Sequence, residues 1–142
     1  MSIGVSTSLL VRQEKCTYAI PFESILETIK CPEDQLIGLH NSFGFYYRGS
    51  VIPVVHLQNL LRNKKVVSQQ KNKMFTIGNT LNLIVVRSQK GNYAIIVDQL
   101  LQYLELAIKQ MPETLAEIQV FSGVSILGDG NLVLVLNPEH LI

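Results

Sequence analysis

The sequence of 142 residues has little charge, few cysteines and no long apolar run. Only 16% of its residues are charged and 47% are hydrophobic, a balance that argues against intrinsic disorder. No apolar run reaches about 18 residues, so we expect no spanning helix and no direct membrane insertion. The amino-terminal residues lack the features of a secretory signal, and two cysteines, Cys16 and Cys31, make no disulfide framework. These absences predict a reduced, cytoplasmic compartment.

The motifs of common catalytic and cofactor sites are also missing. The sequence contains no G-x-G-x-x-G, no G-x-x-x-x-G-K-[ST] and no G-x-S-x-G. Its three histidines share no ligand spacing with one another or with the cysteines. Asp98 and Glu105 lie in an apolar run, and we interpret them as residues that end a strand or tie down a turn rather than as a paired acid and base. We therefore expect no catalytic residue, no metal and no cofactor, and no enzyme activity.

The charge balance bears on the kind of partner. A formal net charge of +1 gives no reason to expect nucleic-acid binding, although a small-barrel nucleic-acid binder remains a remote alternative. Residues 62–80 are rich in Lys, Arg, Gln and Asn, and we interpret them as a solvated connector rather than as a basic patch for a phosphate-bearing partner, because no aromatic residues interleave with the lysines. High apolar content with little charge instead predicts a surface that meets another protein.

Residues 121–137 predict a β-hairpin. Asp129 and Gly130 lie between two apolar runs, and Asp-Gly is a strong hairpin-turn signal. Residues 132–136 are apolar at five successive positions, which predicts a strand covered on both faces. A second hairpin is expected at 43–57 with its turn at 48–50, and Pro53 there requires an edge or a bulge because it cannot donate to a ladder. Further strands are expected at 7–13 and 17–22, a helical turn and a strand from 23, mostly loop at 31–42, and short helices at 57–62 and 112–118.

The chain contains two copies of one unit. Residues 9–27 lie over 84–102 at an offset of 75 residues, with Tyr18-Ala19-Ile20 matching Tyr93-Ala94-Ile95. Residues 48–61 lie over 129–142 at an offset of 81 residues, with Gly49 matching Gly130. Each copy predicts about five short strands, and closure into a small barrel would remove the raw sheet edges. We predict one all-β domain over 1–142 with a first barrel at 7–62, a linker at 63–80 and a second barrel at 81–142. The two barrels share an apolar seam, and exchange of strands between them is left open.

Arg48 is the most distinctive candidate for binding. It stands at the expected hairpin tip after Phe43, Phe45, Tyr46 and Tyr47, next to Gly49. An arginine beside aromatics at a turn is typical of an interface anchor. An arginine stacked on its own barrel is an equally good interpretation.

The repeat, together with RGSVIPVVHL, YAIIVD followed by ELAIKQM, and FSGVSILGDGNLVLVLN, resembles the CheW-like domain of bacterial chemotaxis over residues 7–142. The segment from Glu105 to Lys109 and residues 122–130 are more similar to the carboxy-terminal regulatory domain of a CheA-type histidine kinase than to the free-standing coupling protein CheW. The resemblance implies two SH3-like barrels and a non-enzymatic signalling scaffold. It implies that the domain couples chemoreceptors and a CheW-type protein to kinase activity, with a free-standing CheW as the alternative.

The resemblance also implies partners and a binding surface. The expected partners are a CheW-type coupling protein, the cytoplasmic tip of a chemoreceptor and, in a longer chain, the adjoining kinase catalytic domain. The expected location is the cytoplasm, at receptor arrays on the inner face of the membrane. The residues that the resemblance places at the receptor or partner surface are Ile25, Glu27, Arg48, Gly49, Val51, Leu100 and Leu104.

Overall fold

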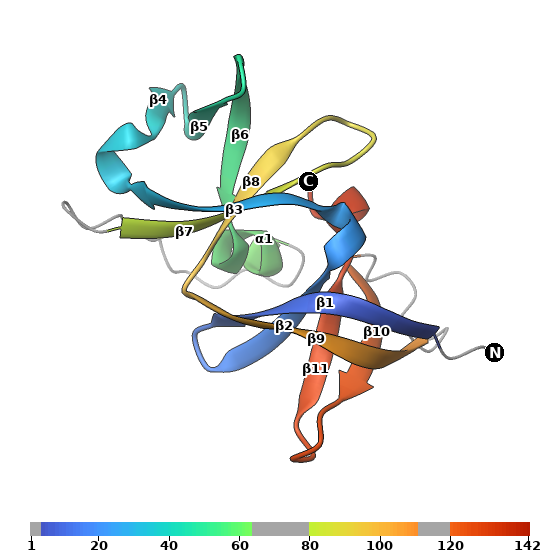
Figure 1. The fold of residues 1–142 in the computed structure, drawn as a ribbon. Coiled ribbons are helices and arrows are strands. Elements are labelled where there is room, and N and C mark those ends of the chain that lie inside the picture. Colours follow the sequence, from blue (N-terminus) through green and yellow to red (C-terminus); the bar gives the residue numbers. More distant parts are fainter. Residues whose placement is uncertain (1–3, 64–79, 111–119) are drawn as a thin grey trace.

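The computed structural model describes residues 4–63, 80–110 and 120–142 (Figure 1). These residues form mostly β-structure together with the short helix α1 (Leu57–Asn63), which was predicted at 57–62. Before the helix come β1 (Gly4–Gln13), β2 (Cys16–Pro21), β3 (Ile25–Pro32), β4 (Ile37–Leu39), β5 (Ser42–Tyr47) and β6 (Ser50–His56). After it come β7 (Thr80–Val86), β8 (Tyr93–Val97), β9 (Gln99–Gln110), β10 (Phe121–Ile126) and β11 (Leu132–Leu136). Single 3-10 turns are η1 (Phe22–Ser24), η2 (Glu33–Gln35) and η4 (Pro138–His140).

The described strands form two bodies. A closed five-stranded barrel has the order β1-β2-β11-β10-β9, and a six-stranded sheet has the order β3-β7-β8-β6-β5-β4. In Figure 1 the dark-blue and orange-red ends of the chain meet in the barrel, and the light-blue, cyan, green and yellow strands make up the sheet. The predicted all-β fold is confirmed. Of the two barrels expected, one is closed, whereas the second body is a six-stranded sheet in which the short strand β4 adds to the expected five.

Each body combines strands from both copies of the repeat. β1 and β2 come from the first copy and complete the barrel with β9, β10 and β11 of the second copy. β7 and β8 of the second copy lie between β3 and β6 of the first. The order β3-β7-β8-β6-β5 therefore reproduces the barrel order β9-β1-β2-β11-β10, strand for equivalent strand. The register repeats as well, because Val54 pairs with Ala94 as Val135 pairs with Ala19.

This topology corrects the predicted division into a first barrel at 7–62 and a second at 81–142. The two copies exchange their first two strands, which was the arrangement that the sequence left open. A single copy of this size is marginal as an independent fold, so burying its strands against those of the other copy completes both bodies. The repeat identifies equivalent strands but not which copy supplies each neighbour. The predicted linker at 63–80 lies, apart from its first and last residues, outside the described residues.

The predicted apolar seam between the bodies is confirmed. Successive residues of a strand point to opposite faces, so one strand can serve two cores. In β7, Leu83 packs in the core of the sheet while Ile84 joins the shared core; in β1, Leu10 packs inside the barrel while Leu9 joins the shared core. Each such fully buried aliphatic side chain contributes about 1.5–3 kcal/mol relative to exposure. Other members of the shared core are Val11, Ile20, Leu57, Leu60, Val86, Tyr93, Ile95, Val97, Val120, Leu136 and Leu141.

The hairpin predicted at 121–137 is present as β10 and β11, and Gly130 in its turn has a φ of 89°. Val133 and Val135 are buried inside the barrel. Leu132 is nevertheless 59% exposed, and Ile126 opposite it is 68% exposed. The prediction that the second strand is covered on both faces is therefore wrong at the turn end of the hairpin. The turn end of the hairpin reaches past the barrel, and none of the elements that the structure describes covers it there (Figure 1).

The region predicted as mostly loop, 31–42, contains η2 and β4. β4 pairs with β5 alone and its residues are exposed, so it is a short edge strand that propensity does not reveal. Pro53 lies in β6 just before the pairing with β8 begins at Val54, as expected for a residue without an N–H group. The helix predicted at 112–118 lies outside the described residues. None of the helices that the structure describes has the length and apolar character to cross a membrane.

Candidate partner-binding site

The residues expected at a partner surface fall into two groups. Glu27 on β3 lies beside Arg48 and Gly49, which form the turn between β5 and β6. Ile25, at the start of β3, is half-buried against the shared core. Val51 is 50% exposed and pairs with Tyr46, on the face of β6 opposite to Ile52.

The second group lies on β9. Leu100 is half-buried against the shared core, and Leu104 is half-buried against the core of the barrel. Tyr103 between them is the more exposed side chain, at 45%. The structure therefore brings Glu27, Arg48 and Gly49 together, while Leu100 and Leu104 pack mainly against the shared core and the barrel core and are only partly exposed.

The β5–β6 turn has two residues, because Tyr47 pairs with Ser50. Arg48 has a φ of 50° and Gly49 a φ of 90°, the combination of a type I′ hairpin turn. Glycine has no Cβ and adopts a positive φ freely, whereas an L-residue such as arginine loses about 1 kcal/mol. The turn alone would favour asparagine, aspartate or glycine at position 48. An arginine in this conformation points to a role for its side chain.

Glu27, Tyr47 and Arg48 form a closed cluster of three side chains, the Glu27–Tyr47–Arg48 cluster. Arg48 Nη2 lies 3.3 Å from Glu27 Oε1, and Arg48 Cζ lies 5.2 Å from the centroid of the Tyr47 ring. The Tyr47 hydroxyl donates to the same carboxylate oxygen at 3.1 Å. Burial and this hydrogen bond raise the pKa of Tyr47, so its hydroxyl remains a donor.

The cluster holds Arg48 in position without burying it. The side chains of Arg48 and Glu27 are 73% and 42% exposed, so their ion pair contributes little to stability. The interpretation of Arg48 as an arginine stacked on its own body is confirmed by its contact with Tyr47. That contact leaves most of the guanidinium at the surface, so the role of Arg48 as an interface anchor stays a prediction.

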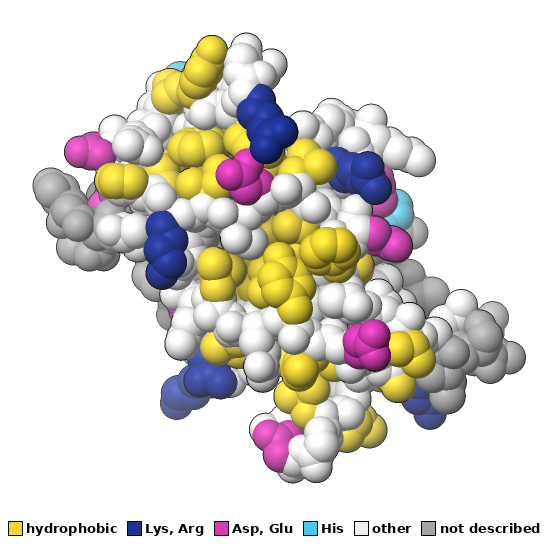
Figure 2. Space-filling view, viewed as in Figure 1, with side chains coloured by type: hydrophobic (Ala, Val, Ile, Leu, Met, Phe, Trp, Pro, Cys, Tyr) yellow, Lys and Arg dark blue, Asp and Glu magenta, His cyan; other side chains and the backbone are white. Residues whose placement is uncertain are grey.

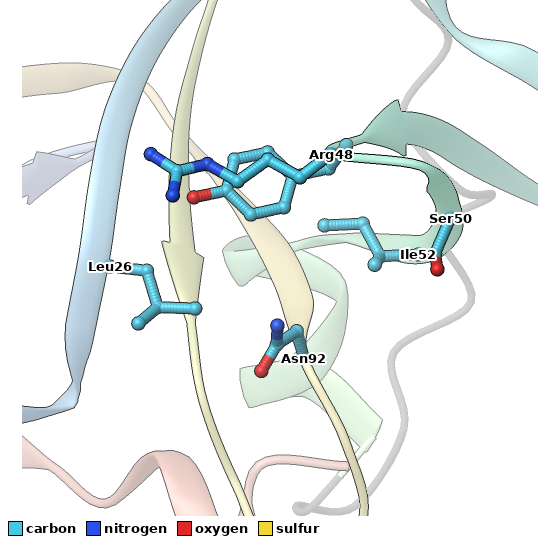
Figure 3. Close-up of a pocket in the computed structure, with 6 residues that line it drawn as sticks. Leu26, Arg48, Ser50, Ile52 and Asn92 are labelled. Atoms are coloured by element: carbon cyan, nitrogen blue, oxygen red, sulfur yellow. The ribbon is translucent and has the colours of Figure 1, made fainter.

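A pocket of about 260 Å³ lies beneath Arg48 (Figure 3). Leu26, Ile52 and the Tyr47 ring supply its apolar lining, and Ser50 and Asn92 add polar groups. Asn92 comes from the connection between β7 and β8, and therefore from the other copy of the repeat. Strand exchange thus brings a residue of the second copy to the hairpin of the first.

Exposed apolar side chains extend from this pocket to the junction of the two bodies. Leu26 on β3 is 41% exposed, and Phe22 in η1 is 56% exposed. The ring of Phe22 meets that of Tyr103 edge-to-face, with 5.6 Å between centroids. Figure 2 shows hydrophobic side chains gathered over the middle of this face, with charged side chains around them. Apolar surface with a charged margin is typical of a protein–protein interface.

A family model described as "CheW-like domain" matches residues 7–142 of this chain. The chain belongs to the CheW-like domain family. The resemblance seen in the sequence is confirmed, and the chain is a CheW-like domain of chemotaxis signalling.

Several curated relatives of this CheW-like domain are chemotaxis proteins. Chemotaxis protein CheA of Bacillus subtilis is 28% identical over 142 residues, which cover 100% of this chain and 20% of the relative. Chemotaxis protein CheA of Listeria monocytogenes is 26% identical over 140 residues, 98% of this chain and 21% of the relative. Sensor histidine kinase CheAY of Helicobacter pylori is 21% identical over 137 residues, 96% of this chain and 16% of the relative. The chain thus spans about a fifth of the length of the curated relatives that it matches.

A solved structure has the same fold. The scaffolding protein TtCheW from Thermoanaerobacter tengcongensis superposes with a TM-score of 0.66 and 15% identity, over 97% of this chain and 92% of that one. The predicted pair of small β-bodies is therefore the architecture of the family. Membership of this family also confirms the prediction of a non-catalytic scaffold.

Asp98 has the structural role that was predicted for it in this CheW-like domain. Its carboxylate accepts a hydrogen bond from the backbone N–H of Glu14 at 2.8 Å, and its own N–H donates to Gln13 Oε1 at 3.2 Å. These bonds tie the β1–β2 turn of the barrel to the point where the chain leaves β8 of the sheet for β9. Glu105 lies seven residues along an extended strand, about 23 Å away at 3.3 Å per residue. The two carboxylates therefore cannot act as an acid–base pair.

Other chemistry is equally sparse in the part of the chain that the structure describes. No group of three or more His, Cys, Asp or Glu side chains there could hold a metal ion. Cys16 is exposed and Cys31 is buried, and neither forms a disulfide. Burial raises the pKa of the Cys31 thiol, so it remains protonated.

Sequence reasoning missed four residues of this surface: Phe22, Leu26, Tyr103 and Asn92. Phe22 was assigned to the end of a strand, although it lies in η1 between the bodies. Leu26 was one more apolar residue of an expected strand, and only its exposure sets it apart. Nothing in the local sequence links Asn92 to the hairpin at Arg48, because strand exchange creates that contact.

Proposed function

We propose that this CheW-like domain is the regulatory domain of a CheA-type histidine kinase. In this role it couples chemoreceptors and a CheW-type protein to the kinase activity of an adjoining catalytic domain. The proposal is supported by relatives that carry the name CheA at up to 28% identity over the whole chain. The observation that carries it is an exposed arginine, held by Glu27 and Tyr47 above a pocket with apolar and polar walls, at the edge of an apolar surface.

We place the receptor tip on the surface that runs from Arg48 to the junction of the two bodies. A helical tip can place its apolar side chains against Leu26, Phe22 and Tyr103. These three exposed residues provide an apolar surface on both bodies. Aromatic and arginine residues are the side chains that dominate the energy of such contacts. A helix bound there would touch β3 of the sheet and β9 of the barrel at once.

We place the CheW-type protein on the exposed turn ends of the hairpins. Ile126 at the end of β10 and Leu132 at the start of β11 are 68% and 59% exposed and lie opposite each other, next to the turn. In the sheet the position equivalent to Leu132 is Val51, which is also exposed. These paired apolar ends suit contacts between CheW-like domains through either body.

Coupling in this domain would act through the relation between its two bodies. The chain crosses from the barrel to the sheet at η1 and returns at Asp98. The first crossing contains Phe22 of the proposed receptor surface, and the second is held by the hydrogen bond from the Glu14 N–H to the Asp98 carboxylate. Signalling requires that the receptor make different contacts in its two states, because a partner shifts an equilibrium only by its differential affinity. We place the domain in the cytoplasm, at receptor arrays on the inner face of the membrane.

A free-standing CheW coupling protein is the alternative, favoured by the likeness to TtCheW over 92% of that chain. The two functions use the same surfaces but differ in what precedes the domain. Sequencing upstream of Met1 separates them, since the kinase requires a reading frame that continues into an ATP-binding domain.

A binding titration tests the proposed function. The domain is mixed with a receptor-tip fragment and with a CheW-type protein from the same source, and micromolar affinity, about −8 kcal/mol, is expected for each. Arg48→Glu should weaken binding of the receptor tip at least tenfold. Lys30→Glu, on an exposed position of β3, is the matched charge reversal and should leave binding unchanged.

A charge swap separates binding from local structure. Arg48→Glu alone sets two carboxylates side by side, whereas Glu27→Arg with Arg48→Glu re-forms an ion pair with its charges reversed. If Arg48 contacts the receptor, the swapped variant folds normally and still fails to bind. Full recovery of binding in the swapped variant would show that the ion pair acts only by shaping the turn. If the wild-type domain bound neither partner, the proposed function itself would be refuted.

A further inference from the structure

We propose that the pocket beneath Arg48 receives one apolar side chain from a helical partner segment that carries an acidic residue one turn away. This inference rests on the proposed function in so far as that segment belongs to the receptor tip. It adds the chemistry that the segment must have and assigns Leu26, Ile52 and Asn92 as the residues that select it.

The size of the pocket favours a side chain over a free metabolite. Sites for small molecules usually have volumes of about 300–1,000 Å³, and this pocket has about 260 Å³. Leu26 and Ile52 line it together with the ring of Tyr47, which is 8% exposed. An aliphatic side chain of leucine or isoleucine type would remove these walls from water, as anchor residues do at the centre of an interface.

The positive charge of Arg48 at the mouth of the pocket favours an acidic residue on the partner helix. One nitrogen of the Arg48 guanidinium bonds Glu27, and the exposed group has further N–H donors in a planar fork. A carboxylate is the acceptor that matches such a fork best. Side chains four positions apart on a helix have Cβ atoms about 5–6 Å apart, so one helix can present both groups. Figure 3 shows Arg48 and Asn92 on opposite sides of the pocket, so an entering side chain passes between them.

The repeat supplies an internal comparison. The barrel has the same hairpin as the sheet, with the strands in the same relation. The positions equivalent to Tyr47, Arg48 and Asn92 are Gly128, Asp129 and Thr17. The barrel therefore lacks the aromatic wall, the cation and the amide, and its turn carries the opposite charge. The pocket is a property of these side chains rather than of the architecture, which is expected if it recognises a specific partner.

The test uses a synthetic helical peptide with one leucine and, four positions later, one glutamate. Two control peptides replace the leucine with alanine or the glutamate with lysine. Binding to the whole domain is followed through the methyl NMR signals of Leu26 and Ile52. We expect a saturable shift with the first peptide and at least tenfold weaker binding of both controls. Equal binding of the three peptides, or no shift at about millimolar concentration, would overturn the proposal.

Variants of the domain make the test specific to the pocket. Asn92→Phe fills the pocket from its rim and should weaken binding of the leucine peptide at least tenfold. Gln89→Phe adds the same ring to an exposed position of the same connection, outside the pocket, and should have no effect. Unchanged binding by Asn92→Phe, with the fold confirmed by its NMR spectrum, would also overturn the proposal.

The receptor-tip fragment is titrated in parallel, so that the two proposals can fail separately. If the fragment binds the wild type and Asn92→Phe equally, the pocket proposal falls and the proposed function stands. If the leucine peptide binds as expected and the fragment does not bind, the pocket proposal stands and the receptor assignment falls. Loss of fragment binding in Asn92→Phe but not in Gln89→Phe supports both.

Discussion

Replacing Gly123 with alanine should open the barrel at the place where it closes. β10 joins β9 in the described residues through the pairs of Gly123 with Gln110 and of Val124 with Lys109. A Cβ atom on Gly123 would lie 2.5 Å from the carbonyl oxygen of Lys109 and 2.6 Å from Cγ2 of Ile108. The absence of a side chain at Gly123 is therefore what allows the two strands to approach.

The expected loss follows from the size of the overlap. Ordinary contacts between carbon and a carbonyl oxygen begin at about 3.3 Å, so the strands would have to separate by about 0.8 Å. Overpacking of this kind costs about 1–3 kcal/mol. Because a backbone oxygen cannot swing aside as a side chain can, we expect a loss of about 2 kcal/mol for Gly123→Ala. At about 3 °C for each kcal/mol in a domain of this size, the Tm should fall by about 6 °C.

Two other glycines provide controls for urea and thermal unfolding followed by circular dichroism. A Cβ on Gly44 would meet Cγ1 of Val51 at 2.7 Å, but this side chain is half-exposed and can move, so Gly44→Ala should lose less than about 1 kcal/mol. A Cβ on Gly128 would meet nothing within 4 Å, so Gly128→Ala should be neutral. If Gly123→Ala were as stable as Gly128→Ala, the tight closure of the barrel inferred here would be refuted.

Three further predictions concern the turn and the tyrosines. Gly49→Ala should lose about 1 kcal/mol in urea unfolding, because φ is 90° there although space is free; an unchanged variant would contradict the type I′ turn. Tyr93→Phe removes a buried hydroxyl that donates to the carbonyl of Pro138, and should lose about 1–2 kcal/mol; a loss near zero would show that this bond does not hold η4. Burial raises the pKa of Tyr18 to about 12 and raises the pKa of Tyr93 as well, whereas unfolded tyrosines ionise near pH 10. Stability should therefore be complete below about pH 10 and decline as the pH rises through about 12, and a flat profile of urea midpoints over that range would contradict it.

The strands and turns could be predicted because their signals are local. Alternating or continuous apolar runs mark β-strands, and Gly49 and Gly130 mark turns by their capacity for positive φ. Pro53 likewise gave a local signal, because its missing N–H group predicts an interruption in strand pairing, and the pairing of β6 with β8 begins only at Val54. The internal repeat and the family resemblance then predicted that these strands form two similar bodies.

The candidate site was predictable only in part. The hairpin at Arg48 was found from its aromatic neighbours and its glycine. Its ion pair with Glu27 joins residues 21 positions apart, and the contribution of Asn92 depends on strand exchange. The exposure of Phe22 and Tyr103 likewise depends on how the two bodies meet, and neither residue differs in its local pattern from one that is buried.

The sequence by itself determined the all-β class, the two copies of the unit, the main turns and the family. The tertiary structure decided which copy completes which body, which apolar residues stay exposed, and which side chains gather around Arg48. The physical reason is that turn geometry and strand periodicity are set by neighbours along the chain. The pairing of strands is instead set by the total apolar surface buried between distant segments, and here that burial is completed by exchange between the copies.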